Sequence, residues 1–424
     1  MDTIFALSSG APPAGIAIVR VSGPRAGEAL TALSGALPPA RQARRAALRD
    51  LAGARLDEGL VLWFPGPGTA TGEDLAEFHL HGGRAVVAAV EAALGAIAGL
   101  RRAEPGEFTR RAFANGRIDL AEAEGLADLL AAETEIQRRA AIGMAGGQLS
   151  RQVEGWREPL LALSARIEAA LDFEDEADVG RLGDAFAHEI NGLADEIACA
   201  LRAPVAETLR EGYRVALAGP PNAGKSTLFN ALIDNEAAIT APIAGTTRDV
   251  LVRPVALGGI PFTFVDMAGL RDAGDDPVEA IGIERAQAEI ERADLVLWLG
   301  AEGEGPAGAW EIEPQCDRAG RALKATPRYR LSATSGENMG PLKQGLIAAA
   351  SGAMPKPGET VLNRRQRNLL AQALAALELA EGEVDTLLLA EQLRQARLAF
   401  DRLVGRSSTE DVLDALFGRF CIGK

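Results

Sequence analysis

The chain has 424 residues, of which 47% are hydrophobic and 24% charged, and its formal net charge is −15. This length predicts two or three domains, each able to bury a core. The negative charge argues against broad nonspecific nucleic-acid binding, and no stretch approaches the ~20 uncharged apolar residues that a membrane-spanning helix needs. Because the acidic excess lies after residue 118, any RNA contact would have to be local.

The cysteines and the amino-terminal segment indicate a reducing, cytoplasmic setting. Cys199, Cys316 and Cys421 are widely spaced, which fits neither a disulfide framework nor a zinc site. The opening MDTIFALSSG contains an acidic residue and no basic region, so no secretory signal is expected. Cys199 lies within an Ala- and Leu-rich helical pattern, where we expect it to be part of the core.

Residues 1–118 alternate short β-type runs with Ala- and Leu-rich helical stretches. The β-type runs are GIAIVRVSG, EGLVLWF and LAEFHLHGG. This alternation predicts a small α/β or α+β domain. The third run contains His79 and His81, but no third His or Cys lies nearby, so we expect structural roles for both rather than a metal site.

Helix-type sequence lies on both sides of a second α/β segment. Residues 119–210 place Leu, Ile and Ala at helical spacing, interrupted by an acidic segment at 172–180 that we expect to be a loop. Residues 211–354 contain the apolar strands YRVALAG, PFTFVDMAG and ADLVLWLG, which are typical of a mainly parallel sheet. Helical periodicity resumes over 355–424. This order predicts an α/β domain inserted into a helical domain.

The segment GPPNAGKS, residues 219–226, matches the phosphate-binding pattern G-x-x-x-x-G-K-[ST]. It follows the strand YRVALA and leads into the helical pattern TLFNALI, which is the context that the motif requires. Backbone N–H groups would wrap the phosphates, and the helix N-terminus adds a favourable dipole. Lys225 would then reach the β- and γ-phosphates of a nucleotide, and the Ser226 hydroxyl would bind Mg²⁺.

Two further motifs indicate a GTPase-type switch protein rather than a generic ATPase. In DMAG, which follows the strand PFTFV, Asp266 is suited to the Mg²⁺ shell and the Gly269 N–H to sensing a γ-phosphate. AGTTRD, residues 244–249, lies between the two motifs and offers a threonine to Mg²⁺. Leu270 follows DMAG and has no group that could orient a water molecule, so another residue or a partner must do so.

The base-recognition motif is degenerate. Guanine-specific proteins use N-K-x-D, in which the Asp accepts a bidentate bond from guanine and the Lys stem covers the ring. The aligned segment is PQCD, residues 314–317, which keeps Asp317 and loses both Asn and Lys. Ser332 and Ala333 still supply a serine–alanine pair after a short strand. We therefore expect a weakened guanine preference and a lowered nucleotide affinity.

These motifs, together with VEAIGIERA, resemble the GTPase domain of the tRNA-modifying MnmE (TrmE) family, in the TrmE-Era-EngA-YihA-Septin-like GTPase superfamily. The resemblance extends over the chain, through DTIFALSSGAPPAGIAIVRVSG, TGEDLAEFHLHGG, EPGEFTRRAFANGRIDLAEAEGLADLL, ALDFEDE and the terminal FCIGK. It implies a multidomain α/β and all-α fold. The expected parts are an α/β folate-binding and dimerisation domain at 1–118, a discontinuous helical domain at 119–210 and 355–424, and an inserted P-loop GTPase domain at 211–354.

The resemblance also implies a reaction. Members of the family act as homodimers in a heterotetramer with the flavoprotein MnmG, and they add an aminomethyl or carboxymethylaminomethyl group to carbon 5 of the wobble uridine of certain tRNAs. A 5-formyl- or methylene-tetrahydrofolate would supply the one-carbon unit, and FAD on the partner would supply redox chemistry. GTP would be hydrolysed to GDP and phosphate when two G domains meet, with K⁺ as part of the machinery.

The resemblance assigns the K⁺ ligands. Asn222 corresponds to the asparagine that binds K⁺, which supplies positive charge where an arginine finger would otherwise act. The matching K⁺ loop contains Ala241, Ile243 and Thr246. Ala241 stands where a threonine can occur, a tolerable change if the ligand is the backbone carbonyl.

The resemblance also supplies the missing water-orienting group. Glu279 matches the glutamate that orients the attacking water, which compensates for Leu270, and Thr247 corresponds to the switch ligand of Mg²⁺. The expected catalytic residues are Lys225, Glu279 and Cys421. The expected GTP contacts are Asn222, Ala223, Gly224, Lys225, Ser226, Thr227, Gly245, Thr246, Thr247, Asp266, Gly269, Asp317, Ser332 and Ala333.

The folate site has a physical rationale as well as a resemblance. A pterin edge pairs with a carboxylate, and the glutamate tail of a folate attracts cations. By resemblance, Glu77 would read the pterin, while Arg20 and Arg117 would hold the rest of the ligand. Arg117 stands where a lysine can occur, and either residue supplies positive charge. The alternative is that all three are exposed strand-end or helix-cap residues.

The terminal FCIGK follows SSTEDVLDALFGRF, which predicts a last helix with Ser408 or Thr409 as N-cap. In the family that the chain resembles, this tail lies near the folate domain and its lysine helps to bind the folate, which assigns that role to Lys424. Cys421 has two interpretations: a thiol that takes part in the modification chemistry, or a side chain that packs the last helical turn.

Two other functions stay open on the residues alone. One is an assembly or ribosome-associated GTPase of the Era/Der type, which a test of folate binding by residues 1–118 would distinguish. The other, suggested by PQCD, is a nucleotide-binding scaffold with little hydrolysis. A comparison of GTP turnover in K⁺ and in Na⁺ would decide between that scaffold and a K⁺-dependent enzyme.

Overall fold

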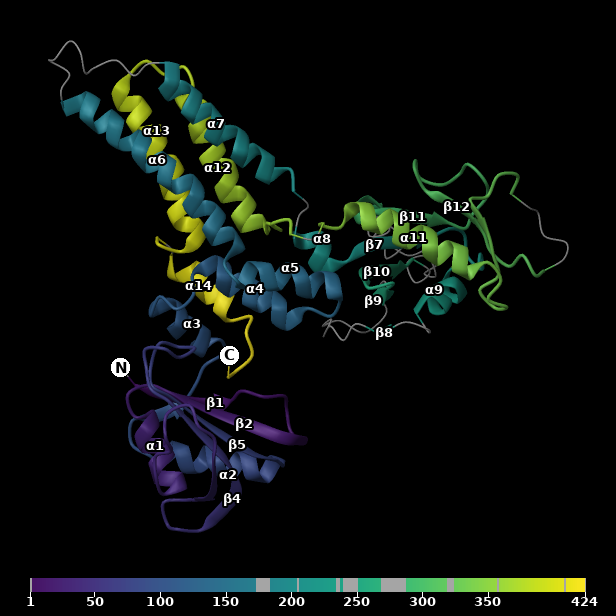
Figure 1. The fold of residues 1–424 in the computed structure, drawn as a ribbon. Helices are drawn as coiled ribbons and strands as arrows, with labels where there is room; N and C mark the ends of the chain where they lie inside the picture. Colours follow the sequence, from purple (N-terminus) through teal and green to yellow (C-terminus); the bar gives the residue numbers. More distant parts are fainter. Residues whose placement is uncertain are drawn as a thin grey trace, which may run out of the picture. The chain divides into compact units, whose positions relative to one another are not determined.

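Figure 1 shows a computed structural model of the chain, which describes residues 2–172, 184–203, 206–233, 237–238, 251–267, 287–318, 324–356, 358–407 and 409–423. The chain divides into two compact units, and each is described by itself. The first unit comprises Met1–Ala127, Leu149–Leu161 and Arg397–Lys424, and the second comprises Asp128–Gln148 and Ala162–Ala396.

A six-stranded sheet lies in the first unit, in the order β3-β4-β5-β2-β1-β6. All neighbouring strands are antiparallel except β1 and β6, which are parallel. The strands are β1 (Thr3–Leu7), β2 (Ala14–Ser22), β3 (Arg44–Arg49), β4 (Arg55–Phe64), β5 (Leu75–Gly82) and β6 (Leu100–Arg102). The three strands expected from the sequence are therefore confirmed as β2, β4 and β5.

One face of this sheet is packed against helices. Because side chains alternate along a strand, every second residue of β2 and β5 enters a core shared with α1 (Ala26–Ser34) and α2 (Arg84–Gly95). The residues between them, including Arg20 and Glu77, lie on the opposite face, where Ile16 is 63% exposed. The candidate folate residues of the sheet therefore lie away from α1 and α2.

The last helix of the chain also packs in the first unit. α14 (Glu410–Phe417) forms an apolar cluster with the start of α4 (Leu120–Ala131) and with Phe113 of α3 (Glu107–Ala114). The rings of Phe113 and Phe417 have centroids 6.2 Å apart. This packing fixes the point from which the carboxyl-terminal tail leaves the helix.

The second unit contains a seven-stranded sheet in the order β13-β12-β11-β7-β10-β9-β8. Four of the six neighbouring pairs are parallel, and the two antiparallel pairs both involve β9. The strands are β7 (Tyr213–Ala218), β8 (Ala237–Ala238), β9 (Leu251–Leu257), β10 (Ile260–Asp266), β11 (Leu295–Trp298), β12 (Trp310–Glu313) and β13 (Tyr329–Arg330). The expected mainly parallel sheet is confirmed.

Helices that come before, between and after these strands in the chain complete the core of this sheet. α9 (Lys225–Ile233) and α11 (Met339–Ala353) bury apolar residues against the strands, as do α8 (Ala206–Glu211) and α5 (Glu135–Ala145). The connection from β11 to β12, residues 299–309, contains no helix. It is short for a crossover between parallel strands, which usually includes one.

The remaining helices are α6 (Gln148–Asp172), α7 (Asp184–Leu201), α12 (Arg364–Ala380) and α13 (Thr386–Val404). Most of the acidic segment expected to be a loop lies outside the described residues. Cys199 of α7 is exposed, so its expected core position was wrong. The last buried apolar residue of α7 is Ile197. Cys199 comes two residues later, which is a rotation of about 200° around the helix axis, so its side chain lies on the opposite face. Within the described ranges, no helix is long and apolar enough to cross a membrane.

Candidate functional sites

The phosphate-binding motif forms the expected strand–loop–helix unit in the second unit. β7 ends at Ala218, the loop follows, and α9 begins at Lys225. Lys225 is 6% exposed, and its Nζ donates to the carbonyl oxygens of Gly219 and Pro220, each at 2.9 Å. The ammonium group is therefore held over its own loop, where a phosphate would lie.

Backbone conformation explains the glycines of this loop. Gly219 has φ +148° and Gly224 has φ +98°, which side chains disfavour. A Cβ on Gly219 would also lie 3.0 Å from the amide nitrogen of Gly300. Asn222 has φ +59°, in the left-handed region that asparagine tolerates best after glycine. Its side chain is exposed, as are Ser226 and Thr227, whereas Ala223 is buried; all of these were expected to contact GTP.

Asp266 lies at the end of the strand beside the phosphate loop. It is the last residue of β10, is 2% exposed, and pairs in register with Leu217 of the parallel strand β7. The carboxyl ends of these two strands therefore meet at one edge of the sheet, the usual place for a ligand in such a fold. The Asp266 carboxylate and the Ser226 hydroxyl are hard oxygen donors, which suit Mg²⁺.

The two base-recognition segments come together. Asp317 follows β12 and hydrogen-bonds with the side chain of Ser332, which follows β13 and is fully buried. That hydrogen bond holds the pKa of the Asp317 carboxyl below its ordinary value. Ala333, the next residue, is half-buried. The acceptor expected for guanine is therefore oriented although the motif around it is degenerate.

Several expected site residues lie outside the described residues, and their roles stay predictions. They are Ala241, Ile243, Gly245, Thr246, Thr247, Gly269, Glu279 and Lys424, together with Leu270.

Arg20 and Glu77 form an ion pair in the first unit. They face each other across β2 and β5, and Arg20 donates to Glu77 Oε1 from Nε at 3.1 Å and from Nη2 at 2.8 Å. His79 Nε2 lies 3.1 Å from Glu77 Oε2. Burial raises the pKa of Glu77, but the hydrogen bonds from Arg20 and His79 outweigh it and leave that pKa below its ordinary value.

This arrangement changes what the two residues can do. Arg20 holds the Glu77 carboxylate in place through Nε and Nη2, and its expected contact with the folate stays a prediction. An ionised carboxylate offers about four acceptor positions, so Glu77 can still accept a bond from a ligand. His79 was missed as a neighbour of Glu77, although its spacing of two residues on a strand could have shown that both side chains share one face. His81 pairs instead with Asp57, with Nδ1 and Oδ1 2.8 Å apart.

Arg117 lies just after α3, against the loop that precedes β5. The backbone N–H of Arg117 donates to the Ala112 carbonyl at 2.8 Å. The Arg117 side chain packs against Gly72: its Cγ lies 3.2 Å from the point where a Cβ would stand if residue 72 had a side chain. Among the described residues, no hydrogen bond or ion pair joins Arg117 to Arg20 or Glu77. The structure therefore brings two of the expected folate residues into contact and places the third on a neighbouring loop.

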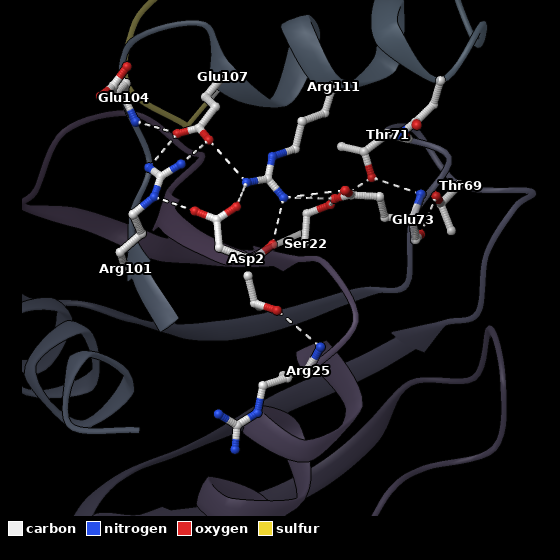
Figure 2. A network of polar contacts seen from close by, with 12 residues as sticks. Asp2, Ser22, Arg25, Thr69, Thr71, Glu73, Arg101, Glu104, Glu107 and Arg111 are labelled. Carbon is white, nitrogen blue, oxygen red and sulfur yellow. Dashed lines mark hydrogen bonds and ion pairs between the residues drawn. The ribbon is translucent and has the colours of Figure 1, made fainter. Parts of the chain in front are cut away.

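Figure 2 shows a polar network that fixes α3 and this loop, and that the sequence did not reveal. Arg111 donates to Asp2 Oδ1 at 2.7 Å, Glu107 Oε1 at 3.0 Å and Glu73 Oε2 at 3.2 Å. Arg101 donates to Glu107 Oε2 at 2.8 Å and also pairs with Asp2. The motif EPGEFTRRAF contained one signal for it, the i,i+4 pair of Glu107 and Arg111.

The network favours the ionised form of two of its carboxylates, Glu107 and Asp2. Burial raises the pKa of Glu107, but hydrogen bonds from Arg101, from the Glu104 N–H and from Arg111 lower it further, so the pKa lies below its ordinary value. Burial also raises the pKa of Asp2, but hydrogen bonds from Arg101 and Arg111 outweigh it and leave that pKa below its ordinary value. Both carboxylates therefore add stability to the folded unit at neutral pH.

The carboxyl-terminal tail docks on the end of β1. Thr409 is the N-cap of α14 but makes no side-chain cap bond, and Ser408 lies outside the described residues. Ile422 forms a β-bridge with Pro105. Gly423 has φ +95°, and a Cβ there would lie 2.8 Å from the carbonyl carbon of Leu7.

The docked tail lies near the Arg20–Glu77 pair. Leu7 and Ala6 of β1 face Val19 and Arg20 of β2, and Arg20 faces Glu77 of β5. Adjacent strands are about 4.8 Å apart, so Gly423 is roughly two strands from Glu77. Cys421 is exposed, which contradicts a packing role for its side chain.

Comparisons with known proteins agree with these observations. A family model described as MnmE helical domain matches residues 120–421, and one described as GTP-binding protein TrmE N-terminus matches residues 3–117. The tRNA modification GTPases MnmE of Erythrobacter litoralis and Novosphingobium aromaticivorans are each 61% identical to this chain, with 100% of both chains covered. The structure of Aquifex aeolicus Era with GDP and AlF4⁻ was also compared with this chain. The superposition has a TM-score of only 0.25 at 23% identity, and it covers 41% of this chain and 69% of the Era chain. The chain is a GTP hydrolase and belongs to the MnmE family of tRNA modification GTPases.

Proposed function

We propose that this chain is a K⁺-dependent GTPase that works with the flavoprotein MnmG to add an aminomethyl or carboxymethylaminomethyl group at carbon 5 of the wobble uridine of certain tRNAs. A 5-formyl- or methylene-tetrahydrofolate bound to residues 1–118 supplies the one-carbon unit, and FAD on the partner supplies the redox chemistry. The working unit is a homodimer in a heterotetramer with MnmG, in the cytoplasm. The proposal keeps the helical domain at 119–210 and 355–424 and the GTPase domain at 211–354.

The GTPase half of the proposal assigns one task to each residue. Lys225 pairs with the β- and γ-phosphates, for which it is already oriented by the carbonyls of its loop. Ser226 and Asp266 hold Mg²⁺, with Thr247 as a further ligand. Asn222 binds K⁺, and its exposed side chain is compatible with that role. Glu279 orients the attacking water.

The observation that carries the one-carbon half is the docked tail. Gly423 is the last described residue, and it lies one strand from Arg20 and two from Glu77. Lys424 follows Gly423 directly in the sequence, and in this proposal its ammonium group meets the anionic end of a folate whose pterin is held by Glu77. Cys421 lies two residues before Gly423 and is exposed to solvent, so a substrate can reach its thiol.

Dimerisation has support in the same sheet. Ile16 is 63% exposed and Leu60 is 45% exposed, and both lie on the face that carries Arg20 and Glu77. A second copy that covers this face would remove that apolar surface from water, which favours association.

The K⁺ dependence can be tested with one substitution and a matched control. We expect GTP turnover of the wild type to be faster in KCl than in NaCl, and Asn222→Ala to remove that difference because K⁺ loses its side-chain ligand. Asn230→Ala changes an exposed asparagine of α9 and should leave the K⁺ stimulation intact. Equal rates in K⁺ and Na⁺ for the wild type would contradict the mechanism, and full stimulation in Asn222→Ala would contradict the role of that residue.

The Era/Der-type alternative is not favoured, since the family models and the relatives cover the regions outside the GTPase domain as well. The scaffold alternative rested on the degenerate PQCD. The scaffold is not favoured either, because full-length relatives are named as GTPases. The bond between Asp317 and Ser332 bears on base binding and not on hydrolysis. Nucleoside analysis of tRNA after deletion of the gene tests the whole proposal, with loss of the wobble modification as the expected result.

A further inference from the structure

The short helix α8 lies directly before the first strand of the GTPase sheet and contacts the segment by which the chain leaves that sheet. The N–H of Ala206, its first residue, donates to the Leu362 carbonyl at 3.0 Å. Oε1 of Glu207 accepts a bond from the Arg364 N–H at 2.9 Å. Both partners lie at or just before the start of α12. The segments that enter and leave the GTPase sheet are therefore held together at α8.

The carboxyl half of α8 is tied to α4 and α5. Arg210 forms a forked ion pair with Asp128 of α4, in which Nε lies 2.7 Å from Oδ1 and Nη2 lies 2.8 Å from Oδ2. Gln137 of α5 donates from Nε2 to the Leu209 carbonyl at 2.9 Å. Two parallel N–H···O bonds fix the orientation of the partners as well as their distance. The ion pair therefore sets where the end of α8 lies against α4.

Apolar packing between α8 and these two helices is incomplete. A cavity lies here, and the side chains of Asp128, Gln137 and Arg210 border it. Much of its lining is alanine, namely Ala131, Ala132, Ala140, Ala141 and Ala206. Side chains that face a cavity lose the dispersion contacts that a close-packed interface provides. The position of α8 against α4 and α5 therefore depends strongly on the polar ties.

The end of α8 is joined to two strands that carry nucleotide residues. Gly212 connects Glu211 to β7, whose carboxyl end begins the phosphate loop. The Glu211 carbonyl accepts a bond from the hydroxyl of Thr263 in β10, three residues before Asp266. A Cβ on Gly212 would lie 2.9 Å from backbone carbons of β10, so this joint has little free space. Because β7 is joined covalently and β10 by a hydrogen bond, a shift of α8 displaces the phosphate loop relative to Asp266.

We propose that the ion pair between Asp128 and Arg210 is a positioning element for GTP hydrolysis. Asp128 holds α8 from α4, and α8 aligns the phosphate loop with the carboxylate of Asp266. Neither member of the pair touches the nucleotide, so both are positioning residues. The phosphate loop and Asp317 keep their own local geometry without the pair, so the pair acts on kcat and leaves KM unchanged.

The size of the effect is limited by the pair itself. An interaction cannot shift a conformational equilibrium by more than its own differential free energy. The two side chains are 33% and 30% exposed, and measured energies of such pairs correspond to rate changes of up to roughly fivefold.

Two single variants and their combination test the pair. Asp128→Asn keeps the shape of the side chain and removes its charge, and Arg210→Gln removes the guanidinium fork. Each should lower kcat by roughly twofold to fivefold with the KM of the wild type. The double variant should lower kcat no further than either single variant, because both substitutions remove the same interaction.

The measurement is steady-state GTP turnover of the full chain in KCl, at a temperature well below the thermal unfolding midpoint of every variant. Glu189→Gln is the matched control, because Glu189 of α7 pairs with Arg166 of α6 at 2.8 Å and 2.9 Å; it should leave kcat unchanged. A pair that only stabilised the fold would lower the unfolding midpoint and leave kcat at the wild-type value, which would overturn the proposal. Losses that add in the double variant, or that occur in KM instead of kcat, would overturn it as well.

Discussion

Gly423 offers the most direct test of how the tail reaches the folate residues. Alanine at this position adds one methyl group, removes no charge or hydrogen bond, and lies far from the nucleotide residues in sequence. In the folded chain, that methyl carbon would lie 2.8 Å from the carbonyl carbon of Leu7 and 3.0 Å from the Cα of Ser8, and closer still to the Leu7 carbonyl oxygen. These atoms are backbone of the last residue of β1 and of the residue that follows it, so they have little freedom to move away.

The size of the effect follows from two terms. A non-glycine residue at φ +95° costs about 1–2 kcal/mol. Relief of the contact with β1 requires the tail to shift, which adds at least about 1 kcal/mol in line with other overpacked sites. Together these terms favour an undocked tail by at least about 2 kcal/mol relative to the wild type. Since 1.4 kcal/mol corresponds to a factor of ten, a shift of about 2 kcal/mol lowers the docked population, and with it the folate affinity, by up to roughly thirtyfold.

The assay is calorimetric titration of the full chain with 5-formyltetrahydrofolate, together with GTP turnover in KCl. Gly423→Ala should weaken folate binding and leave GTP turnover unchanged. Gly155→Ala is the control, because nothing lies within 4 Å of a Cβ at Gly155 in α6; its folate affinity should match the wild type. Wild-type folate affinity in Gly423→Ala would refute the inference that the docked tail delivers Lys424 to the ligand.

Three further predictions concern the network, the phosphate loop and the exposed thiol. Glu107→Gln should lower the unfolding free energy by about 2 kcal/mol at pH 7 in urea titrations, because it breaks a charge-assisted network. Since the pKa of Glu107 is lowered by folding, the wild type keeps this stability above the ordinary pKa of a glutamate and loses it as the pH falls through the folded pKa. A difference in unfolding free energy between variant and wild type that does not shrink as the pH falls below the ordinary pKa of a glutamate would contradict this account. Gly219→Ala places a Cβ 3.0 Å from the Gly300 nitrogen at a backbone φ of +148°. GDP affinity should therefore fall at least about tenfold, while folate affinity stays unchanged. A GDP affinity equal to that of the wild type would count against the described loop. Cys421→Ser should abolish wobble modification in nucleoside analysis and spare GTP turnover, with Cys199→Ser, also exposed, as a control that modifies normally; normal modification in Cys421→Ser would exclude a chemical role for that thiol.

The phosphate site was predictable because it is local. G-x-x-x-x-G-K-[ST] works through backbone N–H groups and positive φ angles within eight residues, so the pattern itself contains the geometry. The strands β2, β5, β7 and β10 were predictable for a similar reason, since apolar runs and alternation reflect contacts along one segment. Asp266 followed from its place at the end of such a strand, and Asp317 from the alignment of PQCD with N-K-x-D.

The six-stranded sheet of the first unit could not be predicted in the same way. The arrangement of its candidate folate residues depends on contacts between segments that are distant in the sequence. Arg20 and Glu77 are 57 residues apart, and only the register of β2 against β5 makes them partners. No local pattern in either strand encodes that register. The error at Cys199 was local: Phe186, Ile190, Leu193 and Ile197 mark the buried side of α7 at a spacing of three or four residues, and Cys199 lies off that row.

The carboxyl-terminal tail shows both contributions in one segment. FCIGK could be recognised as a motif and assigned to the folate by resemblance, but the pattern says nothing about where five residues would dock. The answer depends on the packing of α14 against α3 and α4, which aims the tail at the end of β1. There the free space beside Leu7 admits a glycine and no larger residue. Sequence patterns report the chemistry that a segment carries, whereas the steric fit between segments far apart in the chain sets where that chemistry takes place.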